Sequence, residues 1–229
     1  MKNYSSAGVL LILGSFGVFI PYTILAIIFD YPAILRLDAG EILTRFHAGG
    51  NALIAVWWAF ALLGLPLLVA CLQLARLFPA HQRWFTTVGT IGLVVQLVGL
   101  LRWPLVVPVL AKYYLTGDAA TQQASRVVFT AFHQFGGVLL GEHVGQLFTI
   151  AWTAALAQAS YQRQMIGQGL RAWGWVASFI YLLAQSELVA TVVPGFPEVP
   201  LAGFVGSTLW LAWLMAVGMV LWRRSSRTQ

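Results

Sequence analysis

Long runs of apolar residues, separated by short polar segments, dominate the pattern along this chain. A helix that crosses a membrane needs about 20 mostly apolar residues. Six stretches meet that requirement, at roughly 7–29, 50–75, 85–111, 127–158, 171–193 and 201–222. The pattern therefore predicts an all-α, polytopic integral membrane protein with six transmembrane helices.

Composition agrees with this class. Of the 229 residues, 59% are hydrophobic and only 9% are charged, whereas soluble domains carry about 25% charged residues. No repeat or linker divides the chain, so we expect residues 1–229 to form a single transmembrane helical domain. Cys71 is the one cysteine, which excludes an intrachain disulfide.

The basic residues set the expected orientation. If the N-terminus is cytoplasmic, eight Lys and Arg residues fall on the cytoplasmic side and four on the outer side, with Arg102 left inside the membrane. Cytoplasmic loops carry the excess of basic residues in membrane proteins. We therefore expect both termini in the cytoplasm and the helices in a bacterial inner membrane. The same topology accounts for the net charge of +6 without a nucleic-acid partner.

The first outer loop, YPAILRLDAGEILTRF, has two faces at helical spacing. One face is apolar and the other is charged; the residues are Leu35, Ile42 and Phe46 against Asp38, Glu41 and Arg45. This pattern predicts a short interfacial amphipathic helix at 33–46.

Several ionisable groups lie inside the predicted spans. Counting about 1.5 Å per residue from each cytoplasmic helix end places Arg102, Glu142, His143 and Glu187 in the outer third of the membrane. Such groups usually face the bundle interior and pair with one another. We expect Glu142 to pair with Arg102, with Glu187 as the rival partner of that arginine.

The fourth predicted span carries a stripe of small residues. At α-helical spacing, Gly137, Gly141 and Gly145 share one face, which is typical of close packing against another helix. Glu142 and Gln146 lie on a polar stripe beside that face.

Two prolines interrupt the third predicted span beside its arginine. Pro104 and Pro108 each remove a backbone donor and free a carbonyl one turn earlier. Such breaks persist in membranes where neighbours or water satisfy the freed groups. A polar cavity beside Arg102 fits this pattern. The arginine would either hold the anionic or carbonyl head of a ligand or only lock the bundle.

Histidines and tryptophans add two expectations. His47 and His133 lie at similar depth and permit a bis-histidine b-type haem as an alternative, but the preferred expectation is no cofactor and no metal.

Trp57 and Trp103 lie near helix ends, which is typical of interfacial aromatic belts, although Trp103 and Trp152 are also candidates to line the cavity.

Four segments carry a family resemblance. FDYPAILR, GEILTRFHAGG, LRWPLVVPVLA and GEHVGQLFTIAWT resemble motifs of bacterial membrane proteins of the domain-of-unknown-function 4386 type, from about Phe29 to Thr153. The resemblance implies a multi-helix protein of the bacterial plasma membrane. It assigns no activity and no catalytic residue.

The preferred function is binding of a small amphiphilic or lipid-like ligand that enters from the outer leaflet, with Glu142 or His143 as acid or base if chemistry follows. Membrane lipids are the other expected partners. The alternatives are a haem or quinone redox protein, a proton-coupled transporter and a structural membrane partner. The candidate ligand-binding residues are Arg102, Glu142, Gln146, His143, Glu187, His133 and His47.

Overall fold

The computed structural model describes residues 4–226, apart from the side chains of 225 and 226, and these residues form helices without any strand. The predicted all-α class is confirmed. Within this range four segments are long and apolar enough to cross a membrane: Tyr4–Ile28, Ala39–Leu77, Ala80–Thr116 and Ala202–Arg224. Large apolar side chains such as Ile20 and Ile27 are exposed on the outside of the bundle. Lipid tails suit such a surface, as expected for a membrane protein.

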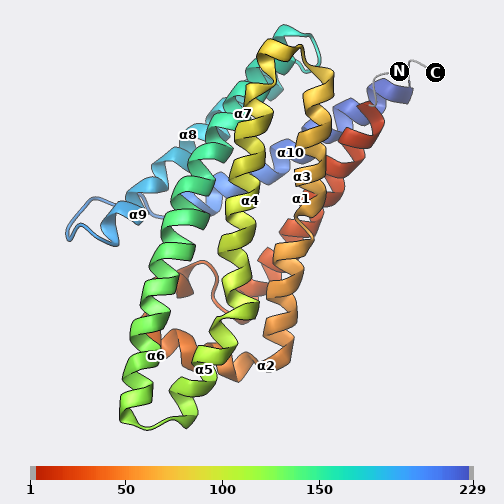
Figure 1. Cartoon of the computed structure of the whole chain (residues 1–229). Helices are drawn as coiled ribbons and strands as arrows, with labels where there is room; N and C mark the ends of the chain where they lie inside the picture. The colour runs from red at the N-terminus through yellow and green to blue at the C-terminus, as the bar shows by residue number, and fades with distance from the viewer. Residues whose placement is uncertain (1–3, 227–229) are drawn as a thin grey trace.

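The first half of the chain runs down the bundle and back. Its helices are α1 (Tyr4–Ile28), η1 (Ala33–Arg36), α2 (Ala39–Leu62), α3 (Leu65–Leu74), η2 (Ala75–Leu77) and η3 (Ala80–Gln82). The second half contributes α4 (Trp84–Leu105), α5 (Val107–Thr116), α6 (Ala119–Phe132), η4 (His133–Val144), α7 (Gly145–Gln162), α8 (Gln168–Leu183), α9 (Gln185–Ala190) and α10 (Ala202–Ser226). Each predicted apolar stretch overlaps a run of these helices, and the runs that overlap 127–158 and 171–193 are not among the four segments long and apolar enough to cross a membrane. α1 begins and α10 ends at the same end of the bundle (Figure 1).

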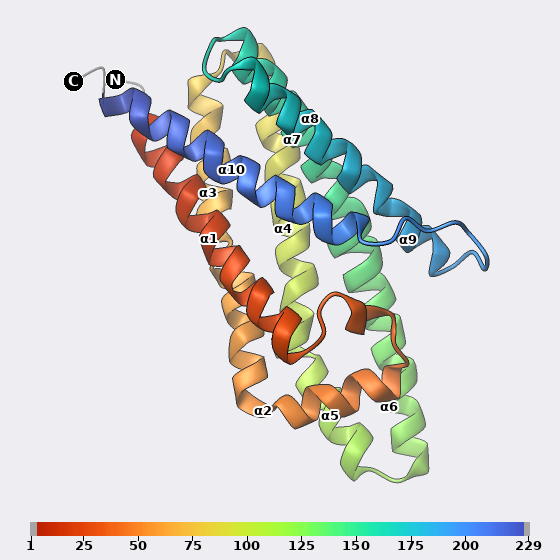
Figure 2. The same cartoon turned by 180° about the vertical axis from the view of Figure 1, so that it is seen from behind.

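The first and last helices, α1 and α10, cross closely at one end and diverge toward the other (Figure 2). At the crossing, a Cβ added to Gly8 would lie 2.6 Å from the carbonyl oxygen of Gly218. Only glycine allows the two backbones to approach this closely. Below the crossing, the space between α1 and α10 lies over α4 and receives side chains from all three helices.

Proline interrupts the third passage as predicted. α4 ends at Leu105, and Val106 has φ −106° before α5 begins at Val107. Pro108 occupies the first turn of α5, where its missing donor leaves no helical hydrogen bond unmade. The break follows Arg102 by one turn.

The predicted helix at 33–46 is not continuous. η1 is a single 3₁₀ segment, Leu37 is extended, and α2 starts anew after Asp38, whose carboxylate accepts a 2.8 Å hydrogen bond from the Gly40 N–H. This hydrogen bond, followed by the Arg126 guanidinium, holds the pKa of Asp38 below its ordinary value. The two faces are nevertheless as predicted, since the three apolar residues are buried and the three charged residues are exposed.

A kink at Gly50 redirects α2. This residue has φ +56°, a backbone conformation that glycine adopts readily and other residues rarely. The segment before the kink crosses the end of the bundle, and the segment after it turns along the bundle axis (Figure 2). The polypeptide thereby changes direction before it enters its second long passage.

The fourth passage contains a feature that the sequence pattern did not predict. η4 is a π-helix of 12 residues, so the α-helical spacing assumed for it was wrong. Its glycine face is still a close-packing surface, as predicted. A Cβ on Gly99 of α4 would lie 2.8 Å from the Cα of Gly141, and one on Gly145 would lie 2.6 Å from the Gln96 side chain.

We predict that Gly99→Ala destabilises the protein. The added methyl group meets backbone atoms of Gly136 and Gly141, which cannot rotate away, and overpacking of this kind costs about 1–3 kcal/mol. Thermal unfolding of the purified protein in detergent measures the change. Gly169→Ala in α8 is the matched control, because nothing lies within 4 Å of its added methyl group. An equal melting temperature for wild type and Gly99→Ala would contradict this packing.

Candidate functional site

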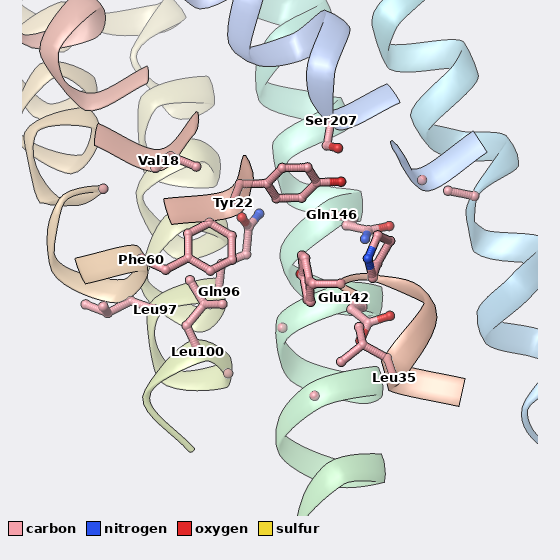
Figure 3. Close-up of a pocket in the computed structure, with 18 of the residues that line it drawn as sticks. Val18, Tyr22, Leu35, Phe60, Gln96, Leu97, Leu100, Glu142, Gln146 and Ser207 are labelled. Carbon is pink, nitrogen blue, oxygen red and sulfur yellow. The ribbon is translucent and has the colours of Figure 1, made fainter. Parts of the chain in front are cut away.

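A cavity of about 520 Å³ lies inside the bundle, between the diverging α1 and α10 helices and in front of α4. Ligand pockets in proteins commonly have volumes of about 300–1,000 Å³ and mainly apolar walls. The wall formed by Phe60, Leu97 and Leu100 is apolar, and Glu142 and Gln146 lie on the opposite side (Figure 3). The site therefore has one apolar side and one polar side.

A cluster of aromatic rings packs behind the cavity wall and reaches the cavity through Trp103. The rings of Trp57 and Trp103 lie 4.5 Å apart at 9°, and Phe29 and Phe46 pack against Trp103. Both tryptophans are almost fully buried, so their predicted place in an interfacial belt is wrong. Trp103 lines the cavity instead, whereas Trp152 is buried elsewhere, against Gly89.

The charged part of the wall is centred on Arg36. Its Nη2 lies 2.5 Å from Oε2 of Glu142, and its Nε lies 2.8 Å from Oε1 of Glu187. One guanidinium thus joins η1 to η4 and to α9. The Arg36 and Glu142 side chains are only 25% and 18% exposed, so solvent screens this pair less than a surface ion pair.

The predicted ion pair between Arg102 and Glu142 is wrong. Arg102 takes part in none of the ion pairs formed within residues 4–226. Its Nη1 donates to the Gly99 carbonyl at 2.5 Å, and the guanidinium lies over the Trp103 ring, 5.1 Å from the ring centroid. A Cβ on Gly137 would collide with this guanidinium. Gly137 therefore provides the space that Arg102 occupies.

Sequence reasoning missed Arg36 because it treated the first outer loop as part of the interface. The loop folds back into the bundle, where Ile34 and Leu35 of η1 are buried. One signal was available. Glu142 and Glu187 are two carboxylates inside predicted spans, whereas Arg102 is a single cation, so a second cation from a neighbouring loop was needed to balance them.

His133 connects the loop to Arg102. Its Nε2 lies 3.0 Å from the Leu35 carbonyl and therefore carries the proton, which leaves Nδ1 free to accept from Arg102 Nη2 across a long contact of 3.5 Å. The ring is buried and stacks on Phe129 at 5.3 Å. His133 positions η1 and Arg102 without lining the cavity itself.

A second polar chain joins η4 and α7 to α9. Nδ1 of His143 donates to Oε1 of Gln185 at 2.7 Å, and Nε2 of Gln185 donates to Oε1 of Gln146 at 2.7 Å. Gln146 lines the cavity, while His143 reaches it only through this chain. His143 therefore has the geometry of a positioning residue.

His47 lies apart from these groups. Its position on α2 is exposed and does not line the cavity. A haem bound by His47 and His133 would require His133 to release Leu35 or Arg102. Across residues 4–226, no three His, Cys, Asp or Glu side chains gather as a metal-ligand set.

Among the charged side chains that line the cavity, three enclosed polar atoms have no hydrogen-bond partner among the described residues. They are two donors, Nη1 of Arg36 and Nε of Arg102, and one acceptor, Oε1 of Glu142. Leaving such a group unsatisfied costs about 1–3 kcal/mol, and more for a charged group. The three atoms belong to side chains that line the cavity but are themselves shielded from it, so a polar guest group would supply the missing partners once these side chains turn toward it.

A second hollow of about 370 Å³ lies against the same wall from the other side. Leu35, Arg36 and Glu187 line both hollows, whereas His133 and Glu198 line only the second. The Arg36–Glu187 ion pair is thus part of a thin partition between an apolar cavity and a more polar vestibule.

The family model described as "Domain of unknown function (DUF4386)" matches residues 6–218. The chain belongs to the DUF4386 family. The matched range contains every residue of the charged wall, and the resemblance seen in the four sequence motifs is confirmed. No curated protein and no solved structure matches this DUF4386 chain.

We predict that Glu142 is coupled to Arg36 more strongly than to Arg102. A double-mutant cycle with Arg36→Gln and Glu142→Gln should give a coupling energy of about 1–3 kcal/mol, because both groups are largely removed from solvent and share a charged hydrogen bond. Chemical or thermal unfolding of the purified protein measures it.

The matched control is the exposed Glu41–Arg45 pair, at 2.6 Å with side chains 45% and 43% exposed. Its coupling should be only about 0.3–0.5 kcal/mol. A larger coupling between Arg102 and Glu142 than between Arg36 and Glu142 would contradict the wall as described.

Proposed function

We propose that this protein spans the bacterial inner membrane six times, with both termini in the cytoplasm. The six helical passages and the eight-to-four distribution of basic residues support this topology. In this orientation the cavity lies in the outer half of the membrane. The segment of α2 before Gly50 then lies along the outer interface, with its charged face toward water.

The cavity binds a small amphiphilic or lipid-like molecule. The observation that carries this proposal is the combination of an apolar cavity with three enclosed polar atoms that lack partners at one wall. An apolar tail fits against Phe60, Leu97 and Leu100. A polar head at the opposite wall supplies the missing hydrogen bonds of Arg36, Arg102 and Glu142.

The ligand reaches the cavity sideways from the membrane. The cavity is lined by Tyr22 of α1 and by Phe204 and Ser207 of α10, and Figure 3 shows Tyr22 and Ser207 near each other on the cavity wall. The Tyr22 and Phe204 rings stack across the gap at 6.1 Å, and Phe204 is 42% exposed. Separation of these two rings would admit a membrane-dissolved molecule without carrying its tail through water.

We predict that purified wild-type protein retains an amphiphile in stoichiometric amount and that Leu97→Trp loses it. The larger ring occupies the space against the apolar wall. The bound molecule is extracted from protein purified in mild detergent and measured by mass spectrometry.

Leu72→Trp is the matched control, because Leu72 is 54% exposed on α3 and does not line the cavity. This variant should retain the amphiphile. The proposal fails if wild type carries no stoichiometric amphiphile, or if both tryptophan variants carry as much as wild type.

We predict that a reporter fused after Gln229 faces the cytoplasm. A fluorescent protein that matures only in the cytoplasm should be active there, and alkaline phosphatase, which needs the periplasm, should be inactive. The same reporters placed in the turn between α5 and α6 should give the opposite result. An active phosphatase after Gln229 would invert the topology and move the cavity to the inner half of the membrane.

A further inference from the structure

The charge balance of the cavity wall restricts the ligand that the proposed binding function requires. Four ionisable side chains of the Asp, Glu, Lys, Arg and His classes line the cavity within residues 4–226: Arg36, Arg102, Glu142 and Glu187. Two guanidinium groups and two carboxylates have a formal charge of zero. The wall is already neutral before any ligand binds.

A charged head would disturb this balance. An anion beside Arg102 would also face the Arg36 cluster, in which one cation is shared by two carboxylates and the net charge is −1. A cation beside Glu142 would face two guanidinium groups. In a site lined mainly by apolar side chains, an uncompensated buried charge is strongly unfavourable. The wall therefore matches neither an anionic nor a cationic ligand head.

The unsatisfied atoms specify what the head must provide instead. Nη1 of Arg36 and Nε of Arg102 each need an acceptor, and Oε1 of Glu142 needs a donor. We infer that the head of the ligand is uncharged, accepts hydrogen bonds from the two arginines and donates one to Glu142. This inference rests on the proposed amphiphile-binding function and names its substrate class.

Hydroxylated esters and primary amides attached to an apolar chain carry this combination of groups. A carbonyl or ether oxygen accepts, and a hydroxyl or amide N–H donates. Fatty-acid anions, alkyl phosphates and alkylammonium ions do not belong to the class, because each brings a net charge. The sequence alone allowed an anionic or a carbonyl head at Arg102, and the charge balance favours the carbonyl.

The test uses three probes with the same twelve-carbon tail: monododecanoylglycerol, dodecyl sulfate and dodecyltrimethylammonium. The full-length protein in lipid nanodiscs is incubated with an equal mixture at low mole fraction. Retained probe is measured by mass spectrometry and compared with protein-free nanodiscs. Wild type should enrich the neutral probe about tenfold or more over either ion.

Single substitutions in the cavity wall should change which of the three probes the protein prefers. Arg102→Gln leaves the wall at −1, so the cationic probe should gain relative to the neutral one. Glu142→Gln leaves it at +1, so the anionic probe should gain. The double variant restores a charge of zero and should again favour the neutral probe. Glu41→Gln is the control, since Glu41 lies outside the cavity and should leave the wild-type preference unchanged.

The outcomes separate the two levels of the proposal. If wild type enriches no probe, the binding function itself fails. If it enriches all three equally, or prefers an ion, binding stands and the neutral class is wrong. If the single variants lose binding without a change in charge preference, charge balance does not select the ligand. The double variant then distinguishes this result from simple misfolding, because restored neutral binding requires a folded cavity.

Discussion

The guanidinium of Arg36, held between the carboxylates of Glu142 and Glu187, is the interaction on which the site depends. It joins three elements that are distant in sequence, namely η1, η4 and α9. The Glu142 carboxylate, whose side chain is only 18% exposed, could not remain enclosed at low energetic cost without a cation, since an uncompensated charge in a bundle interior is strongly unfavourable. The segment between α1 and α2 therefore folds back into the bundle and becomes part of the cavity wall.

The position of this ion pair explains several other features. The buried Ile34 and Leu35 and the hydrogen bond from His133 to the Leu35 carbonyl hold η1 in place. The π-helical η4 presents Glu142 to Arg36 while its glycine face remains packed against α4. Long π-helices are rare, and short π-helical turns are frequent at functional sites. The same wall separates the apolar cavity from the polar vestibule.

The sequence was sufficient for the coarse architecture and for part of the site. Apolar runs predicted the helical passages, Pro104 and Pro108 predicted the break after α4, and the glycine stripe predicted the close contact with α4. Depth counting identified Arg102, Glu142 and Glu187, which do line one cavity. It missed Arg36 because loop folding depends on tertiary contacts that helical periodicity does not encode. The π-helix was missed because its hydrogen bonds are not marked by a distinctive residue pattern.

A structure determined in lipid nanodiscs would test the central claim most directly. Density inside the cavity is the quantity to examine, in protein purified without added amphiphile. The account predicts elongated density along Phe60, Leu97 and Leu100, with its broader end within hydrogen-bonding distance of Arg36, Arg102 and Glu142. A cavity that contains only separate water molecules, with Arg102 paired directly to Glu142, would contradict it.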